Sequence, residues 1–302
     1  MLLLHKYIMF LLKCEEMPSS IINIEIYIYG VDSMHTKVAT ILSEEITPLI
    51  PNELLEEYND FVNPELREVL RANCLRRYLE GAINLLLKNK IVQVADISAE
   101  TWDEYSLNNK IQAIGKHYDC KIKDDFDKLR KIGNKGSHFG DTVLSEEVLE
   151  GIEIATHIIE KILIKYFKDN PIGSQMEVLT LLSSLPPNNR VYILEEIFND
   201  GQKNTLVIDK LSMAYLKSGD YEKSISFLEE QKNAEIISEK DYRAFVGKID
   251  LLNQNLDKFD FAKDVLDVKK TFYEIVNSHD YNEFKEFTDI FLILISGYGI
   301  KN

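Results

Sequence analysis

Apolar residues recur at the spacing of an α-helix along most of this 302-residue chain, from residue 36 onward. The clearest case is segment 64–90, whose predicted helix carries a continuous apolar stripe. Only 13 Gly and 7 Pro interrupt the chain, and these two residue types disfavour helix interiors. The pattern predicts an all-α protein of long helices with short connections, large enough for about two domains. The stripe of segment 64–90 consists of Leu66, Val69, Leu70, Leu75, Leu79, Ile83, Leu86 and Leu87.

The N-terminal arm, residues 1–35, does not follow this helical pattern. Residues 21–29 (IINIEIYIY) place Ile at every second position, which predicts an isolated half-buried strand. A lone strand exposes an unpaired edge. Either the arm pairs with another chain or packs against helices, or the protein starts at Met34 and the preceding residues come from an over-extended reading frame.

The cysteines and the apolar N-terminus indicate the compartment. Cys14, Cys74 and Cys120 are far apart, with no CxxC pair and no His cluster, so we expect no disulfide scaffold, no metal site and no cofactor. The apolar run at the N-terminus covers only about a dozen residues, which is too short to span a bilayer. We therefore expect a cytoplasmic protein without a membrane partner.

The helical part divides into two predicted domains, residues 36–170 and 171–302, at the sequence Asn170-Pro171-Ile172-Gly173. In the first domain, Ser145 is the predicted N-cap of a long closing helix over 145–168. The other helices expected in this domain cover 52–62, 64–90, 104–118 and 122–133.

In the second domain, helices are expected at about 174–185, 189–199, 204–218, 220–231, 239–255, 259–277 and 280–296. The stretch LSMAYLKSGDYEKSISFLEE, around 206–231, resembles the centre of a tetratricopeptide repeat. A looser echo follows at KIDLLNQNLDKFDFAKDVLD. Because two degenerate units fall short of a self-sufficient array, we favour a helical-hairpin domain over a ligand-binding repeat array.

Charge is distributed unevenly along the chain. The formal net charge is −15, which repels nucleic acid and anionic membranes at long range. Residues 64–138 are the exception, with 14 basic and 11 acidic side chains. Any polyanion should therefore bind in this segment, whereas the acidic second half is the candidate surface for a protein partner.

Two segments together resemble a known family. They are LRRYLEGAINLLL, with Arg76, Arg77 and Glu80, and DDFDKLRKIGNKGSHFGDTVLSEEVLEGIEIATHIIEKIL, with Gly133 and Gly136. They resemble the HEPN superfamily (higher eukaryotes and prokaryotes nucleotide-binding) and, within it, the domain-of-unknown-function family 4145. The resemblance covers roughly residues 36–168. It implies a helical bundle that forms a homodimer.

The resemblance also implies a site, from which this sequence departs. Family members that cut RNA bring two Arg-x4-6-His motifs together at the dimer interface, where His is the general acid or base and Arg neutralises the phosphate without a metal. Here His138 is the candidate catalytic residue, but Gly133 stands where those members carry Arg. Arg130, Lys131 and Lys135 are the candidate substitutes for the missing charge.

The same stretch can be interpreted without the family. Gly133, Gly136 and Gly140 fall within eight residues, and backbone N–H groups of a glycine-rich loop can hold an anion. This predicts a nucleic-acid or anion site formed by Arg130, Lys131, Asn134, Lys135 and His138. The alternative is that Gly133 ends a helix, Asn134 caps it, and His138 packs its ring with one hydrogen bond. The sequence leaves both interpretations open.

Three functions are compatible with these features. The leading prediction is an RNA- or nucleotide-associated recognition module, by resemblance in bacterial anti-phage defence or a toxin–antitoxin system, without autonomous catalysis. The second is a metal-independent ribonuclease that uses His138. The third is a protein–protein adaptor that acts through the acidic second half. Salt dependence distinguishes them, because binding to a polyanion weakens steeply as salt rises.

Overall fold

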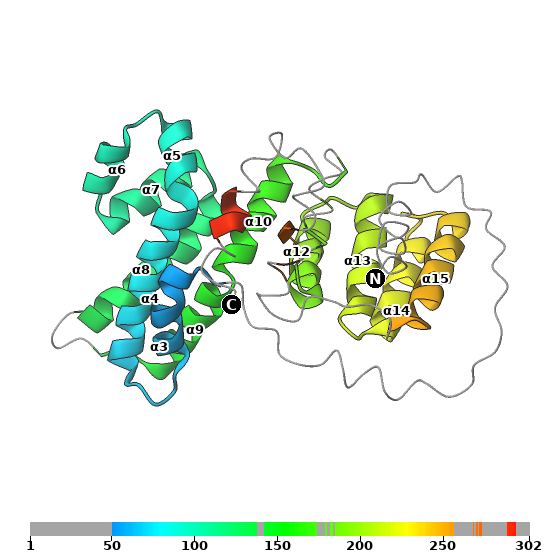
Figure 1. Ribbon diagram of the computed structural model, residues 1–302, viewed down its shortest axis with the longest axis horizontal. Coiled ribbons are helices and arrows are strands. Elements are labelled where there is room, and N and C mark those ends of the chain that lie inside the picture. The colour runs from blue at the N-terminus through cyan, green and yellow to red at the C-terminus, as the bar shows by residue number, and fades with distance from the viewer. Residues whose placement is uncertain are drawn as a thin grey trace. The chain divides into compact units, whose positions relative to one another are not determined.

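The computed structural model describes residues 50–137, 142–173, 179, 182, 183, 185–256, 268, 270, 272, 273 and 289–293. Within these residues it contains twelve α-helices and no strand, which confirms the predicted all-α class (Figure 1). The strand predicted near 21–29 lies outside the described residues, as does most of each helix expected at 174–185, 259–277 and 280–296. No helix in the described part of the chain is both long and apolar enough to cross a membrane.

The chain separates into two compact units between Tyr166 and Phe167. We call residues 50–166 the N-terminal unit and residues 167–256 the C-terminal unit, and each is described by itself. The division falls inside a helix, just before the boundary expected at residues 170–171.

The N-terminal unit begins with a short 3₁₀ turn, η1 (Asn52–Leu54), that leads into α3 (Leu55–Val62). The helix expected over 64–90 begins at Glu68 and contains a π-helical turn. Helix α4 (Glu68–Ala82) continues through the π-helical turn η2 (Ile83–Leu87) into α5 (Lys88–Ala95). Asp96 ends α5 with the left-handed backbone common at helix C-termini (φ 52°).

The helix expected over 104–118 is two helices. These are α6 (Ala99–Glu104) and α7 (Leu107–His117), with Ser98 and Ser106 as their N-caps. Each serine hydroxyl accepts a hydrogen bond from the backbone N–H three residues later, at 3.1 Å and 3.2 Å. The helix expected over 122–133 is longer, as α8 (Cys120–Ser137).

The segment expected to form one closing helix is divided at His157 into α9 (Ser145–Thr156) and α10 (Ile158–Asp169). The predicted N-cap is wrong: Leu144 occupies the cap position, and its N–H donates to the Glu147 carboxylate at 3.3 Å. The hydroxyl of Ser145 instead donates to the Glu68 carboxylate on α4 at 2.8 Å. A long-range partner thus replaces the local capping bond.

The core of the N-terminal unit is aromatic and aliphatic. Trp102, Phe126 and the edge-to-face pair Phe61–Tyr78, with ring centroids 5.1 Å apart, are fully buried. Most of the apolar stripe predicted for segment 64–90 is also buried, as expected. Val69 and Leu70 of the same stripe are exceptions, because they are 41% and 40% exposed.

The C-terminal unit is a series of helices: α12 (Pro187–Asn199), α13 (Thr205–Lys217), α14 (Tyr221–Asn233) and α15 (Glu239–Asn253). Helices α13 and α14 form a hairpin whose turn places Gly219 at φ 94°. Ser212 and Ser224 are fully buried where the two helices meet, and the Ser224 hydroxyl donates to the Ser212 carbonyl at 2.7 Å. Small side chains at this contact allow the helices to lie close together.

Candidate anion-binding site

The glycine-rich stretch after residue 132 is helical. Helix α8 continues without interruption through Gly133, Asn134 and Gly136 to Ser137. Neither glycine has positive φ; the described glycines that do are Gly173, Gly201 and Gly219. The predicted loop conformation is therefore wrong for residues 133–137, and anion binding by these residues stays a prediction. The alternative, in which Gly133 ends the helix and Asn134 caps it, is also wrong.

Both glycines are needed because α8 runs tightly against α4. A Cβ atom on Gly133 would lie 2.3 Å from the Cβ of Arg76, and one on Gly136 would lie 2.7 Å from the carbonyl oxygen of Val69. Since Val69 faces Gly136 and Arg76 faces Gly133, the two helices are antiparallel. We call the facing turns, residues 69–77 of α4 and 130–137 of α8, the α4–α8 crossing.

Polar side chains join the two helices near the last turn of α8. The Asn73 amide donates from Nδ2 to the Gly136 carbonyl at 2.8 Å. The Ser137 hydroxyl lies 2.5 Å from Asn73 Oδ1 and 3.1 Å from the Gly133 carbonyl oxygen. The bond from Asn73 occupies the Gly136 carbonyl, one of the last four of α8, which the helix itself leaves unsatisfied.

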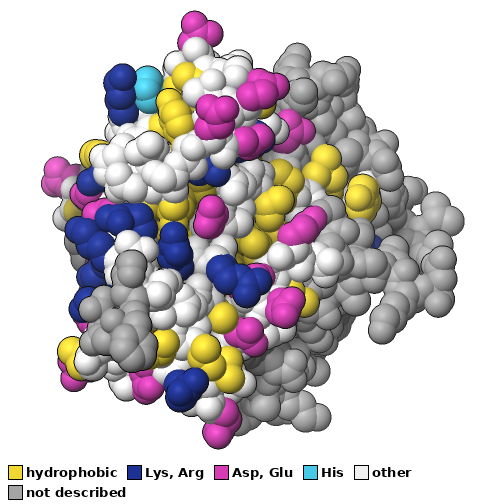
Figure 2. All heavy atoms as spheres, turned by 90° about the vertical axis from the view of Figure 1, so that its left-hand side faces the viewer, with side chains coloured by type: hydrophobic (Ala, Val, Ile, Leu, Met, Phe, Trp, Pro, Cys, Tyr) yellow, Lys and Arg dark blue, Asp and Glu magenta, His cyan; other side chains and the backbone are white. Residues whose placement is uncertain are grey.

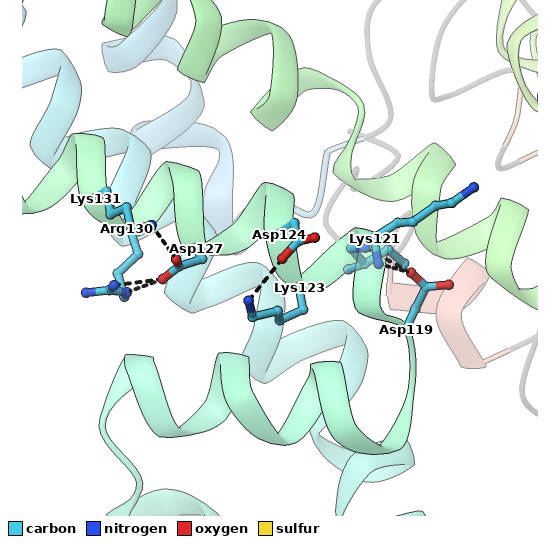
Figure 3. A network of polar contacts seen from close by, with 8 residues as sticks. Asp119, Lys121, Lys123, Asp124, Asp127, Arg130 and Lys131 are labelled. Carbon is cyan, nitrogen blue, oxygen red and sulfur yellow. Dashed lines mark hydrogen bonds and ion pairs between the residues drawn. The ribbon is translucent and has the colours of Figure 1, made fainter.

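Two of the predicted basic residues share one carboxylate. Arg130 donates from Nε and Nη2 to Asp127 Oδ1 at 3.0 Å and 2.7 Å, and Lys131 pairs with Asp127 Oδ2 at 2.8 Å (Figure 3). Hydrogen bonds from Lys131 and Arg130 hold the pKa of the Asp127 carboxyl below its ordinary value. The Asn134 amide, oriented to suit its neighbours, donates to the Arg130 carbonyl at 3.3 Å and accepts from Nη1 at 3.1 Å.

The third predicted cation also has an acidic partner. Lys135 pairs with Glu147 of α9 at 2.5 Å. That hydrogen bond, with one from the Leu144 backbone N–H, lowers the pKa of the Glu147 carboxyl. The ion pair joins the last turn of α8 to the first turn of α9, so Lys135 supports the fold as well as contributing charge.

The two residues assigned to a structural motif on α4 do not form the expected ion pair. Among the described residues, neither Arg76 nor Glu80 makes a hydrogen bond or salt bridge with the other or with any further side chain. Arg76 is partly buried, and its Cβ lies over Gly133. Its neighbour Arg77 points elsewhere and pairs with Glu57 at 2.6 Å.

The candidate catalytic residue His138, like Gly140, lies outside the described residues. Its predicted role stays a prediction. No group of three His, Cys, Asp or Glu side chains within the described ranges is placed to hold a metal ion. The described cysteines, Cys74 and Cys120, are free thiols. The pKa of the Cys74 thiol is raised, and burial is the main cause.

Basic side chains gather on one face of the N-terminal unit. Figure 2 shows Lys and Arg concentrated in the left-hand part of this face, while acidic side chains are scattered over the rest. Helix α8 carries Arg130, Lys131, Asn134 and Lys135 within six residues, and α4 places Arg76 opposite Gly133.

The sequence reasoning missed two residues of this site. Asp127 precedes Arg130 by three residues and Lys131 by four, a spacing at which side chains meet on a helix. That signal could have identified it. Asn73 could not have been found, because its partners lie more than sixty residues away.

Comparison with known proteins is informative only for part of the chain. No curated protein and no solved structure matches it. Residues 67–180 match the model of a family described as Domain of unknown function (DUF4145). This range includes α4 to α10 and therefore the whole of the α4–α8 crossing. The protein carries a DUF4145 domain over residues 67–180, in agreement with the resemblance at the family level.

Proposed function

We propose that the N-terminal unit is a HEPN-like recognition module that binds phosphate groups of RNA or of a nucleotide. The observation that carries the proposal is the gathering of basic side chains on one face of a chain whose net charge is −15. The HEPN assignment and the bacterial defence or toxin–antitoxin setting rest on the sequence resemblance, with support from the DUF4145 match.

Ion pairs at this face are compatible with phosphate binding. The side chains of Lys131 and Lys135 are 66% and 43% exposed, and exposed ion pairs contribute at most about 1 kcal/mol. A phosphate that approaches can therefore exchange for Asp127 or Glu147 at small cost. The acidic remainder of the chain acts against binding elsewhere, which concentrates a polyanion at this face.

The proposal includes no catalytic step. An arginine at position 133 would need its Cβ 2.3 Å from the Cβ of Arg76, so the arginine of the RNA-cutting motif has no room in this helix pair. Without a positive charge at position 133, the motif lacks the group that would stabilise the phosphorane formed during RNA cleavage.

The proposal also includes a homodimer of the N-terminal unit. Four large apolar side chains are exposed at the starts of α4 and α9, which the Ser145–Glu68 hydrogen bond joins. A second copy could cover this end of the unit through the same surface on both partners. The four side chains, 40% to 59% exposed, are Val69, Leu70, Leu144 and Leu149.

The test is binding of a fluorescein-labelled single-stranded RNA to the full-length protein, measured by anisotropy at increasing salt. We expect affinity to fall steeply with salt and a mononucleotide to compete. The pair Lys131→Gln with Lys135→Gln should weaken binding. Lys223→Gln with Lys240→Gln removes the same charge from the C-terminal unit and is the matched control.

Three results would contradict the proposal. If the protein binds neither RNA nor a nucleotide at low salt, the proposed phosphate-binding function is wrong. Binding that does not change with salt would favour the protein adaptor. Metal-independent cleavage of the RNA that disappears in His138→Ala would replace it with the ribonuclease.

A further inference from the structure

The basic side chains of the α4–α8 crossing differ in how they are neutralised. Arg77 pairs with Glu57, Arg130 and Lys131 share Asp127, and Lys135 pairs with Glu147. Arg76 has no acidic partner among the residues that the structure describes. Arg71 is the other basic residue of the crossing that lacks a carboxylate partner among the described residues, but it is buried and donates from Nε to the Phe61 carbonyl at 2.9 Å. Arg76 is therefore the one partly exposed cation of the crossing for which the described residues supply no carboxylate.

The position of Arg76 follows from the glycine opposite. Because Gly133 has no side chain, α8 approaches until an added Cβ would lie 2.3 Å from the Cβ and 3.2 Å from the Cα of Arg76. The stem of Arg76 fills the space that a side chain at 133 would occupy. Arg76 therefore lies directly opposite position 133, and its side chain is partly buried.

We propose that Arg76 makes the principal phosphate contact of this site. This inference rests on the proposed function. The earlier expectation gave this role to Arg130, Lys131 or Lys135, all of which must first release a carboxylate. Among the described residues, no carboxylate pairs with Arg76, so a phosphate has none to displace there. A guanidinium can also bind two phosphate oxygens at once, and its partial burial strengthens the attraction by limiting contact with water.

The expected ligand is a phosphate monoester or diester, which offers two non-bridging oxygens to the guanidinium. Such a group occurs in the RNA backbone and in a free nucleotide. Competition distinguishes these sources: a mononucleotide that displaces RNA only at far higher concentration indicates the polymer, and one that displaces it at similar concentration indicates the nucleotide.

The experiment compares full-length Arg76→Gln with Arg77→Gln, in the same RNA anisotropy assay. Both variants remove one positive charge, keep most of the side-chain stem and lie on adjacent positions of α4. We expect Arg76→Gln to weaken binding about tenfold or more and to reduce the salt slope by about 1. Arg77→Gln should change affinity less than about twofold, because its charge is already offset by Glu57. Arg76→Lys should recover part of the loss.

The outcomes separate the inference from the proposed function. If wild type binds and Arg76→Gln binds equally well, while Lys131→Gln with Lys135→Gln does not, the role of Arg76 is wrong and the proposed function stands. If wild type binds neither RNA nor nucleotide, both are wrong. Unchanged helical circular dichroism in Arg76→Gln, together with weakened binding, supports the inference.

Discussion

One amide oxygen holds together the polar centre of the N-terminal unit. Asn84 Oδ1, in the π-helical turn η2, accepts from Trp102 Nε1 at 3.2 Å and from Lys110 Nζ at 3.0 Å. Trp102 and Lys110 are buried, and the Lys110 ammonium lies 5.6 Å from the Trp102 ring centroid. A buried ammonium without a carboxylate depends on such neutral partners.

Asn84→Leu should therefore destabilise the protein by about 2–4 kcal/mol, because two buried donors, one of them charged, lose their acceptor. Chemical denaturation followed by circular dichroism measures the change. Asn89→Leu, at an exposed position of α5, is the control and should stay within about 0.5 kcal/mol of wild type. Equal effects of the two substitutions would contradict this account.

Asp127 makes stability depend on acid pH. Its pKa is lower in the folded protein than in an unfolded chain, so the folded state binds fewer protons. The stabilisation is complete above the unfolded value, near 4, and is lost as the pH falls through the folded pKa. Asp127→Asn should flatten the loss of stability between about pH 5 and pH 2, measured by denaturation at each pH. Asp124→Asn, which removes an exposed carboxylate from the same helix, should keep most of the wild-type dependence.

At the scale of elements, the α4–α8 pair depends on two glycines inside a helix. Glycine normally weakens a helix by about 0.5–1 kcal/mol relative to alanine. At Gly133 this cost is offset by close contact with α4, where an added Cβ has no space. At Gly247 of α15, an added Cβ would meet nothing within 4 Å. The same substitution should therefore have opposite effects at the two positions.

Gly133→Ala should lower stability by about 1–3 kcal/mol, because the helices must separate or Arg76 must move. Gly247→Ala should raise it by about 0.5–1 kcal/mol. Thermal unfolding followed by circular dichroism measures both changes. A stabilising Gly133→Ala would show that the crossing tolerates a side chain and would weaken the argument for the position of Arg76.

At the scale of the whole molecule, the exposed apolar side chains lie beside the basic site. Val69 faces Gly136, and the Leu144 N–H donates to Glu147, the partner of Lys135. The basic face belongs to a unit within a strongly acidic chain. Exposed leucines gather at the starts of α4 and α9 of the same unit. The proposed dimer surface and the proposed phosphate site therefore share the first turn of α4.

Leu70→Glu with Leu149→Glu should convert the proposed dimer to a monomer at micromolar concentration, since each buried leucine contributes about 1.5–3 kcal/mol. Light scattering measures the mass. Leu251→Glu, at a similarly exposed leucine of α15, should leave the dimer intact. A wild-type protein that is monomeric under these conditions would contradict the dimer.

The sequence alone predicted the helical class and most helix positions, because helical periodicity and capping are local properties. Helices α13, α14 and α15 begin and end within about two residues of their expected bounds. Arg130, Lys131, Asn134 and Lys135 were predicted to form an anion site on a glycine-rich loop; the structure places them on α8, and their role in binding stays a prediction.

The tertiary structure decided what the local pattern could not. A run containing Gly133 and Gly136 usually marks a loop, but here contact with α4 stabilises a helix that local propensity disfavours. Ser145 carries a local capping signal, yet Glu68 from a distant helix takes its hydroxyl. The sequence by itself determined which segments are helical and where basic residues concentrate. Only packing determined that Gly133 lies against Arg76 and that Glu57 and Glu147 pair with Arg77 and Lys135. These contacts depend on residues brought together from different helices.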